Sequence, residues 1–175
     1  MEQKITSTTT KGLVIGLILV IISLATYFTK MDLNGPVKWI GFVVFIVGVI
    51  WSVYSYGKQL NYDSTFGNYF AHGFKVSAVV TLITIIYLVI FVILFPDFKE
   101  NILDQTRIGM RQKNNMTEEQ ISQAMEITKK FFMVGLLGFT LVGYLIVGAV
   151  SALIGAAVTK KEPNKLAGDI NQIGK

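Results

Sequence analysis

The sequence has no cysteine, a single histidine and few charged residues. The absence of cysteine excludes disulfides and thiolate chemistry, and it leaves the redox compartment undetermined. Only 15% of the 175 residues are charged, whereas about 25% is usual in a soluble domain. Hydrophobic residues make up 52%, and the mean hydropathy is +0.55. Because so few charges cannot cover a water-exposed surface, the composition predicts an integral membrane protein.

Four long apolar blocks contain almost no charge. Lys38, at the edge of the second block, is the only charged residue among them. The third block, "VSAVVTLITIIYLVIFVILF", also lacks glycine and proline. A helix rises 1.5 Å per residue, so about 20 apolar residues cross the roughly 30 Å hydrocarbon core. Since lipid offers no partner to a backbone amide, each block is expected to be helical. We therefore predict an all-α protein with four transmembrane helices, organised as a single four-helix membrane domain over residues 1–175. The expected spans are residues 12–29, 37–56, 76–95 and 131–158.

The first block has an alternative interpretation as a signal peptide. Lys4 and Lys11 would form its basic region, and "SLA" at residues 23–25 would be the cleavage site. The apolar run continues past that site to Phe28, and no soluble domain follows it. An uncleaved membrane anchor is therefore favoured.

The distribution of basic residues gives only weak information on orientation. With the N-terminus inside, each side of the membrane has eight Lys and Arg residues, so the positive-inside rule favours neither orientation. The short N-terminus and the basic polar tail, residues 159–175, favour cytoplasmic placement of both termini. Three residues are expected to anchor the chain at the membrane interface, because rings enter lipid while an ammonium group reaches the phosphates. They are Trp39, Phe74 and Lys75.

The longest polar stretch, residues 97–130, is predicted to form an amphipathic helical hairpin outside the bilayer. Apolar residues recur at helical spacing in both halves. Thr117 and Gln120 form a capping box that starts the second arm. One interpretation is a connector that lies on the headgroups or on itself, and the other is a docking module for a partner. The first arm has its stripe at Phe98, Ile102, Leu103, Thr106 and Met110, and the second at Ile121, Ala124, Met125 and Thr128.

Small residues at spacings of four mark candidate helix-packing faces in the spans. Helices approach closely where such residues align, and dispersion then holds them together. In a four-span protein this first implies packing within the chain, with a homodimer as the alternative. The candidates are Gly12, Gly16, Gly48, Ser52, Gly148, Ser151, Ala152 and Gly155.

No catalytic, metal or cofactor site is expected. His72 is the sole histidine, just before a span, and is interpreted as a solvated interfacial residue. Asp63, Asp97 and Asp104 are scattered over two loops. Nucleic acid is not expected either, because no basic run alternates with aromatic residues; the net charge of +5 fits loops facing anionic lipid.

The polar groups within the spans are hydroxyls, which are expected to bond back to their own helix backbone or to a neighbouring helix. Ionisable residues at mid-membrane, the usual marks of ion or proton pathways, are missing. A short polar stripe on one face of the third span, Ser77, Thr81 and Thr84, is the feature that would suit a transport path. The hydroxyl-bearing residues at depth are Ser23, Thr81, Thr84, Thr140, Tyr87 and Tyr144.

Three motifs carry a resemblance to a known family. "NYFAHGFKVSAVVTLI" (68–83), "FPDF" (95–98) and a last span ending in "TKK" (159–161) resemble a small family of bacterial inner-membrane proteins classed as a domain of unknown function. Phe70 and the Phe-Lys-Val of residues 74–76 match the family's stretch before the third span, whereas Ala71 replaces its usual glycine. The resemblance implies four spans in a bacterial cytoplasmic membrane, and it supplies no activity, ligand or catalytic residue.

The favoured function is a non-enzymatic structural or accessory role through helix packing and the loop hairpin. The expected partners are membrane lipid and either a membrane protein or a second copy of the chain. The alternative is a small transporter or channel subunit that acts as an oligomer.

Overall fold

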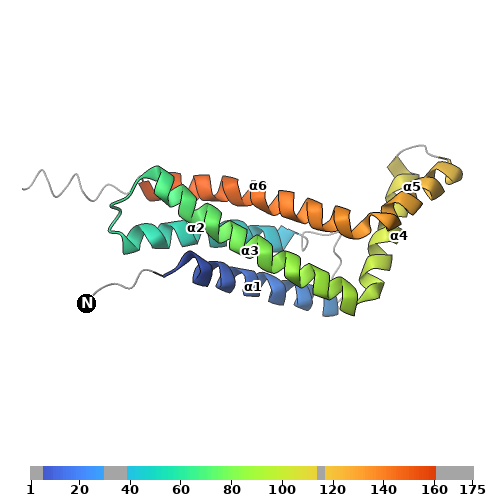
Figure 1. The fold of residues 1–175 in the computed structure, drawn as a ribbon, viewed down its shortest axis with the longest axis horizontal. Helices are drawn as coiled ribbons and strands as arrows, with labels where there is room; N and C mark the ends of the chain where they lie inside the picture. The colour runs from blue at the N-terminus through green and yellow to red at the C-terminus, as the bar shows by residue number, and fades with distance from the viewer. Residues whose placement is uncertain (1–5, 30–38, 114–116, 161–175) are drawn as a thin grey trace, which may run out of the picture. The chain divides into compact units, whose positions relative to one another are not determined.

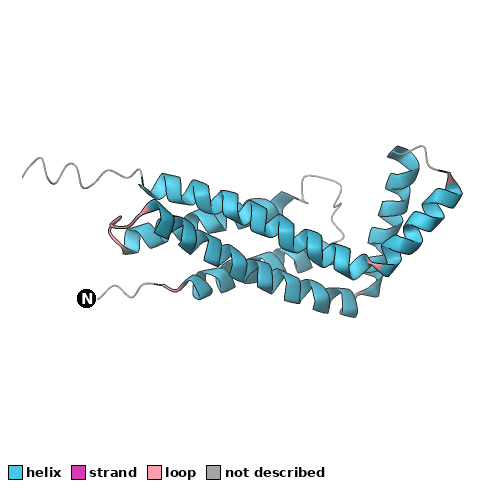
Figure 2. Cartoon of the chain, turned by 45° about the horizontal axis from the view of Figure 1, so that its top comes forward, coloured by secondary structure: helices cyan, strands magenta, loops and turns pink. Residues whose placement is uncertain are grey.

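The fold is all-α. The computed structural model describes residues 6–29, 39–113 and 117–160, and in these residues it contains six helices and no strand (Figures 1 and 2). Four of the helices are long and apolar enough to cross a bilayer, namely α1, α2, α3 and α6, so the protein is a multi-pass membrane protein, as predicted. The elements are α1 (Thr8–Phe28), α2 (Ile40–Gln59), α3 (Phe66–Leu94), α4 (Pro96–Lys113), α5 (Glu118–Lys130) and α6 (Phe132–Lys160).

The largest departure from the expected boundaries is the start of α3. The apolar block begins at residue 76, but the helix begins at Phe66. Thr65 caps this start, because its side chain accepts from the amide of Asn68 (3.3 Å) and its carbonyl accepts from that of Tyr69 (3.2 Å). The 29 residues of α3 give a length of about 44 Å, which exceeds the roughly 30 Å hydrocarbon core. A polar first section therefore precedes the apolar part of this helix.

The turn between α2 and α3 is tight and uses the left-handed region of the backbone. Asn61 has φ 49° and Tyr62 has φ 58°. The amide of Tyr62 donates to the carbonyl of Gly57 (2.8 Å), which closes the end of α2. Asparagine adopts this conformation readily, whereas for tyrosine it is unfavourable. This turn connects α2 and α3, the helices that supply most of the residues of the polar cluster and pocket described below.

The chain forms two compact units. The first, here called the four-helix unit, comprises residues up to Thr84 and from Gly143 onwards, and contains α1, α2 and parts of α3 and α6. Large apolar side chains on its surface remain exposed, for example Leu17 (56%), Val47 (59%) and Leu82 (59%). Such a surface suits lipid as its solvent. Its buried core is formed by Ile15, Leu19, Phe45, Val49, Val76, Val80 and Ala152.

The second compact unit, here called the hairpin unit, comprises residues 85–142. Its helices α4 and α5 pack side by side, so the predicted hairpin is confirmed (Figures 1 and 2). The capping box is also present: Thr117 Oγ1 accepts from the amide of Gln120 (3.3 Å), and Gln120 Oε1 accepts from that of Thr117 (3.0 Å). Phe131 alone separates α5 from α6, so the two helices are nearly continuous. The core is formed by Val92, Leu103, Ile121, Met125 and Phe132.

Candidate functional site

The sole histidine is buried, so its interpretation as a solvated interfacial residue was wrong. His72 is 6% exposed. Its ring stacks on that of Tyr56, with centroids 4.0 Å apart and an interplanar angle of 8°. Its Nε2 lies 3.3 Å from Ser52 Oγ. Because α3 begins ten residues before the apolar block, His72 falls on a helix that packs against α2 and not in a solvated loop.

A second buried polar residue, Lys11, lies close to Ser52 and Tyr56. It is 4% exposed, and its ammonium group donates to the backbone carbonyl of Ser52 (3.1 Å). The ammonium also lies 6.0 Å from the centroid of the Tyr56 ring. Buried charges are usually paired with an opposite charge. Among the residues that the structure describes, no carboxylate lies within ion-pair distance of Lys11.

Ser52 connects three helices through two different atoms. Its carbonyl accepts from Lys11 of α1, and its hydroxyl contacts His72 of α3, while Ser52 itself belongs to α2. The side chain is fully buried. A larger residue would separate α2 from its two neighbours, so the small side chain is what allows the cluster to form. We define the polar cluster as Lys11, Ser52, Tyr56 and His72.

A serine hydroxyl next to an imidazole is also the geometry of a nucleophile and its base. Here the hydroxyl is inaccessible, because Ser52 is 0% exposed. Ser52 is also not among the residues that line the neighbouring pocket. The contact between Ser52 and His72 therefore serves to join α2 and α3.

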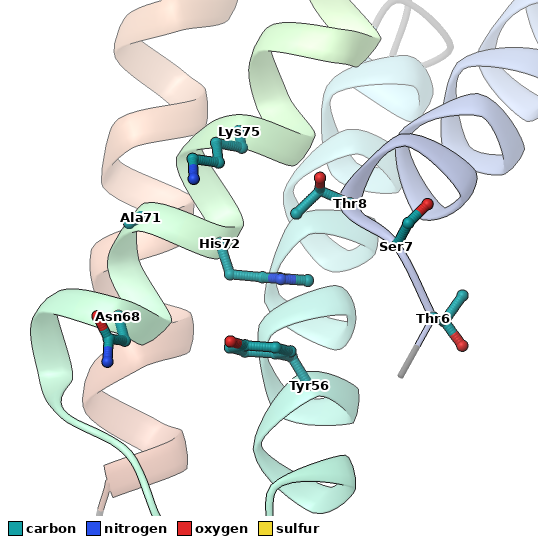
Figure 3. A pocket seen from close by; sticks show the side chains of 8 residues that line it. All are labelled: Thr6, Ser7, Thr8, Tyr56, Asn68, Ala71, His72 and Lys75. Atoms are coloured by element: carbon teal, nitrogen blue, oxygen red, sulfur yellow. The ribbon is translucent and has the colours of Figure 1, made fainter. Parts of the chain in front are cut away.

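A pocket of about 330 Å³ adjoins the polar cluster. Figure 3 shows His72 lying flat against Tyr56, with Lys75 one turn further along α3 and the start of α1 opposite. Hydrogen bonds between Thr6 and Gln59 fix the segment before α1: the Thr6 amide donates to Oε1 (3.0 Å), and Nε2 donates to the Thr6 hydroxyl (3.2 Å). The lining residues are Thr6, Ser7, Thr8, Tyr56, Asn68, Ala71, His72 and Lys75.

The small residues of α1 and α2 lie where helices of the same chain meet. A methyl group at Gly12 would lie 2.6 Å from Val79 Cγ1, and one at Gly16 would lie 2.7 Å from Ile83 Cδ1. These two glycines therefore form the contact between α1 and α3. Gly48 of α2 faces an isoleucine of α1, whose nearest atoms would lie 3.2 Å from an added methyl group.

The small residues of α6 lie at contacts with α3 and α2. A methyl group at Gly148 would lie 2.5 Å from Ser77 Cβ, and one at Gly155 would lie 3.0 Å from Val53 Cβ. The distance at Gly148 is too short for a side chain unless α6 and α3 move apart, and the distance at Gly155 is tight enough that Val53 would have to shift slightly. The small-residue faces are thus occupied inside the four-helix unit. Two further candidates, Ser151 and Ala152, are buried on the same helix.

Hydroxyls within the spans bond to their own helices. Thr81 donates to the Ser77 carbonyl (2.8 Å), and Thr84 and Thr140 make the same bond four residues back (2.9 and 2.7 Å). For these three threonines the prediction of back-bonding is confirmed. Ser77 and Thr81 are 0% and 2% exposed. This part of the polar stripe of α3 therefore faces packed protein within the four-helix unit.

The three proposed interfacial anchors are on the surface. Trp39 is 59% exposed and Phe74 is 38% exposed, and Lys75 is exposed as well. Their accessibility is what contact with headgroups requires, and the anchoring itself stays a prediction. In the described part of the chain, no three His, Asp or Glu side chains come together as a metal site.

One family model matches most of the chain. The family model described as "Protein of unknown function (DUF4199)" matches residues 10–161. The chain belongs to this family. The DUF4199 match includes all four candidate spans apart from the first two residues of α1, and it also covers the whole polar cluster. Neither the curated proteins nor the solved structures contain a significant match to the chain.

Proposed function

We propose that this DUF4199 protein is a non-enzymatic accessory membrane protein that acts through its packed spans and its hairpin unit. The observation that carries the proposal is the polar cluster, in which Ser52 of α2 accepts a hydrogen bond from Lys11 of α1 and contacts His72 of α3. The buried polar groups thus hold the helices together. Lys11 and Ser52 are not among the residues that line the pocket. His72 lines it, but its ring is stacked on Tyr56 and its Nε2 contacts Ser52.

The packing of the spans supports the hairpin unit as the part that engages a partner. The small-residue faces of α1, α2 and α6 are occupied by contacts within the chain. A homodimer through these faces is therefore not favoured. The hairpin unit buries its own apolar stripe and presents charged residues of both signs, such as Arg107, Glu119 and Lys129. A polar surface of another membrane protein would complement it.

Site-specific crosslinking in native membranes would test the accessory role. Because the chain has no cysteine, Gln123→Cys on the exposed side of α5 can carry a photoreactive maleimide without further changes. The matched control is Leu17→Cys, at a site on α1 that is 56% exposed. We expect a protein adduct from position 123 and lipid adducts alone from position 17. Identical lipid-only products from both positions would contradict docking through the hairpin.

Transport is the competing function, and a flux measurement on the purified protein can test it. The hydroxyl stripe of α3 is packed in the four-helix unit at Ser77 and Thr81, which supports a closed protomer. Proteoliposomes should therefore leak neither ions nor small dyes above the level of empty vesicles. Selective flux that rises with the protein-to-lipid ratio would replace the accessory role with a channel or transporter.

We further propose that the protein lies in the cytoplasmic membrane, with the segments before α1 and after α6 in the cytoplasm. Four spans put these two segments on the same side of the membrane, and the basic residues after α6 favour the inside. The tail beyond residue 160 lies outside the described residues. Alkaline phosphatase fused after residues 33 and 114 should be active, and fused after 63 and 175 it should be inactive. The reverse pattern would invert the orientation.

A further inference from the structure

We propose that the pocket beside the polar cluster binds a phosphate-type oxyanion, supplied by the headgroup of a membrane phospholipid. This inference does not depend on docking through the hairpin unit, because all the residues that line the pocket belong to the four-helix unit. It rests on the chemistry of the lining, on a buried cation behind one wall and on the position of the pocket along three helices.

Among the described residues, the lining contains donors and no acid. Lys75 supplies an ammonium group, His72 an imidazole, and Asn68 an amide, which donates one hydrogen bond to Ser64 Oγ (3.1 Å) and can donate a second one to a ligand. Hydroxyls of Thr6, Ser7 and Thr8 add further donors, and no carboxylate is among the lining residues that the structure describes. A cavity with this composition favours an anion over a cation. Phosphate oxygens accept strong, charge-assisted hydrogen bonds from such groups.

A buried positive charge lies behind the pocket wall. Tyr56 forms part of the lining, and the Lys11 ammonium is 6.0 Å from the centroid of its ring. Lys11 is 4% exposed, and within the described residues its side chain donates one hydrogen bond, to a backbone carbonyl, although an ammonium group can donate three. No carboxylate of the described residues pairs with it, and a buried cation without such a partner is costly. An anion in the adjacent pocket would offset that cost.

The start of α1 adds a third source of positive potential, after Lys75 and Lys11. Ser7 caps this 21-residue helix by accepting from the amide of Thr10 (3.1 Å), and the Lys11 amide donates to the Ser7 carbonyl (3.2 Å). The first amides of a helix have no partner within the helix, and the positive end of its dipole favours anions. Thr8 opens α1 and lines the pocket, so this helix end faces the cavity.

The pocket lies where a membrane-embedded protein meets lipid headgroups. Its α3 residues, Asn68 to Lys75, precede the uncharged run that starts at Val76. Thr6, Ser7 and Thr8 precede the apolar run of α1, and Tyr56 comes at the end of the apolar run of α2. The volume of about 330 Å³ is at the lower end of the range of small-molecule sites, about 300–1,000 Å³. The position and the size suit a headgroup.

Binding measurements on the full-length protein in a neutral detergent would test this proposal. The probes are a short-chain phosphatidylglycerol, inorganic phosphate and an uncharged glycolipid of the same chain length, each titrated and followed by native mass spectrometry or ³¹P NMR. The test variant is Lys75→Gln. The matched control is Lys58→Gln, because Lys58 is exposed and lies 4.7 Å from the centroid of the Tyr54 ring, outside the lining.

We expect saturable binding of phosphatidylglycerol that Lys75→Gln weakens about tenfold, the effect of losing one charge-assisted hydrogen bond. Lys58→Gln and the parent protein should bind alike. Tighter binding of inorganic phosphate than of the lipid, with the same dependence on Lys75, would support the oxyanion site and identify a free anion as its source. No phosphate-dependent binding, or equal losses in both variants, would overturn the proposal. Thermal unfolding of each variant confirms that it is folded.

Discussion

Replacing Gly148 of α6 with alanine is expected to destabilise the four-helix unit. The added methyl group would lie 2.5 Å from Ser77 Cβ and 2.7 Å from its hydroxyl oxygen, with Phe45 Cζ at 3.3 Å. Ser77 cannot yield easily, because it is fully buried and donates to the Gly73 carbonyl (3.0 Å). α6 must therefore move away from α3. Overpacking of this kind costs about 1–3 kcal/mol, which corresponds to a roughly 5- to 150-fold larger unfolding constant.

The matched control is Gly143→Ala on the same helix, where a methyl group would meet nothing within 4 Å. Both variants gain the same helix propensity from alanine, so their difference isolates the packing term. Equilibrium unfolding in mixed micelles, with an increasing fraction of dodecyl sulfate and circular dichroism as the signal, measures both. Equal free energies of unfolding for Gly148→Ala and Gly143→Ala would refute the close contact between α6 and α3.

Three further substitutions test individual contacts. Ser52→Ala should lower the free energy of unfolding by about 1–3 kcal/mol, because it leaves the buried imidazole of His72 without its hydrogen-bond partner. Ser151→Ala removes only a hydrogen bond to its own helix, so it should lower the free energy of unfolding by less in the same micelle assay. Thr117→Ala should destabilise the start of α5 by about 0.5–2 kcal/mol, seen as faster amide exchange confined to that helix, and unchanged exchange would argue against the cap. Arg111 donates to Glu118 (2.8 Å) and holds the pKa of that carboxyl below its ordinary value of 4.5. The pair therefore stabilises the hairpin above that value and is lost as the pH falls through the lowered pKa; an NMR titration should show this pKa rising in Arg111→Ala, and an unmoved pKa would contradict the pair.

The spans and the hairpin were predictable because each is encoded locally. An uncharged run such as residues 76–95 has few alternatives to a membrane helix, whatever surrounds it. The capping box at Thr117 and Gln120 involves residues three apart, so the sequence alone indicates where α5 begins. The start of α3 was missed because hydropathy marks only the apolar part of a helix. The cap at Thr65 is the local signal that could have placed it.

The polar cluster was not predictable, because its members come from three helices. Lys11 precedes an apolar run, as a flanking lysine usually does, and nothing near it in sequence indicates burial. His72 needs Tyr56 and Ser52, which lie on the preceding span. The small size of Ser52 marked it as a helix-packing residue, and it does lie at a helix contact. Its size gave no indication of its hydrogen bonds to Lys11 and His72. Only tertiary packing brings these side chains together.

The central claim, four helices that cross a bilayer, is tested most directly by cysteine accessibility in sealed vesicles. The natural sequence is free of cysteine, so single substitutions Asn34→Cys, Asp63→Cys, Asn114→Cys and Lys175→Cys each report one position. A membrane-impermeant maleimide should label positions 34 and 114 from one side and positions 63 and 175 from the other. Labelling of two successive positions from the same side would show that the helix between them does not cross, and would contradict the account.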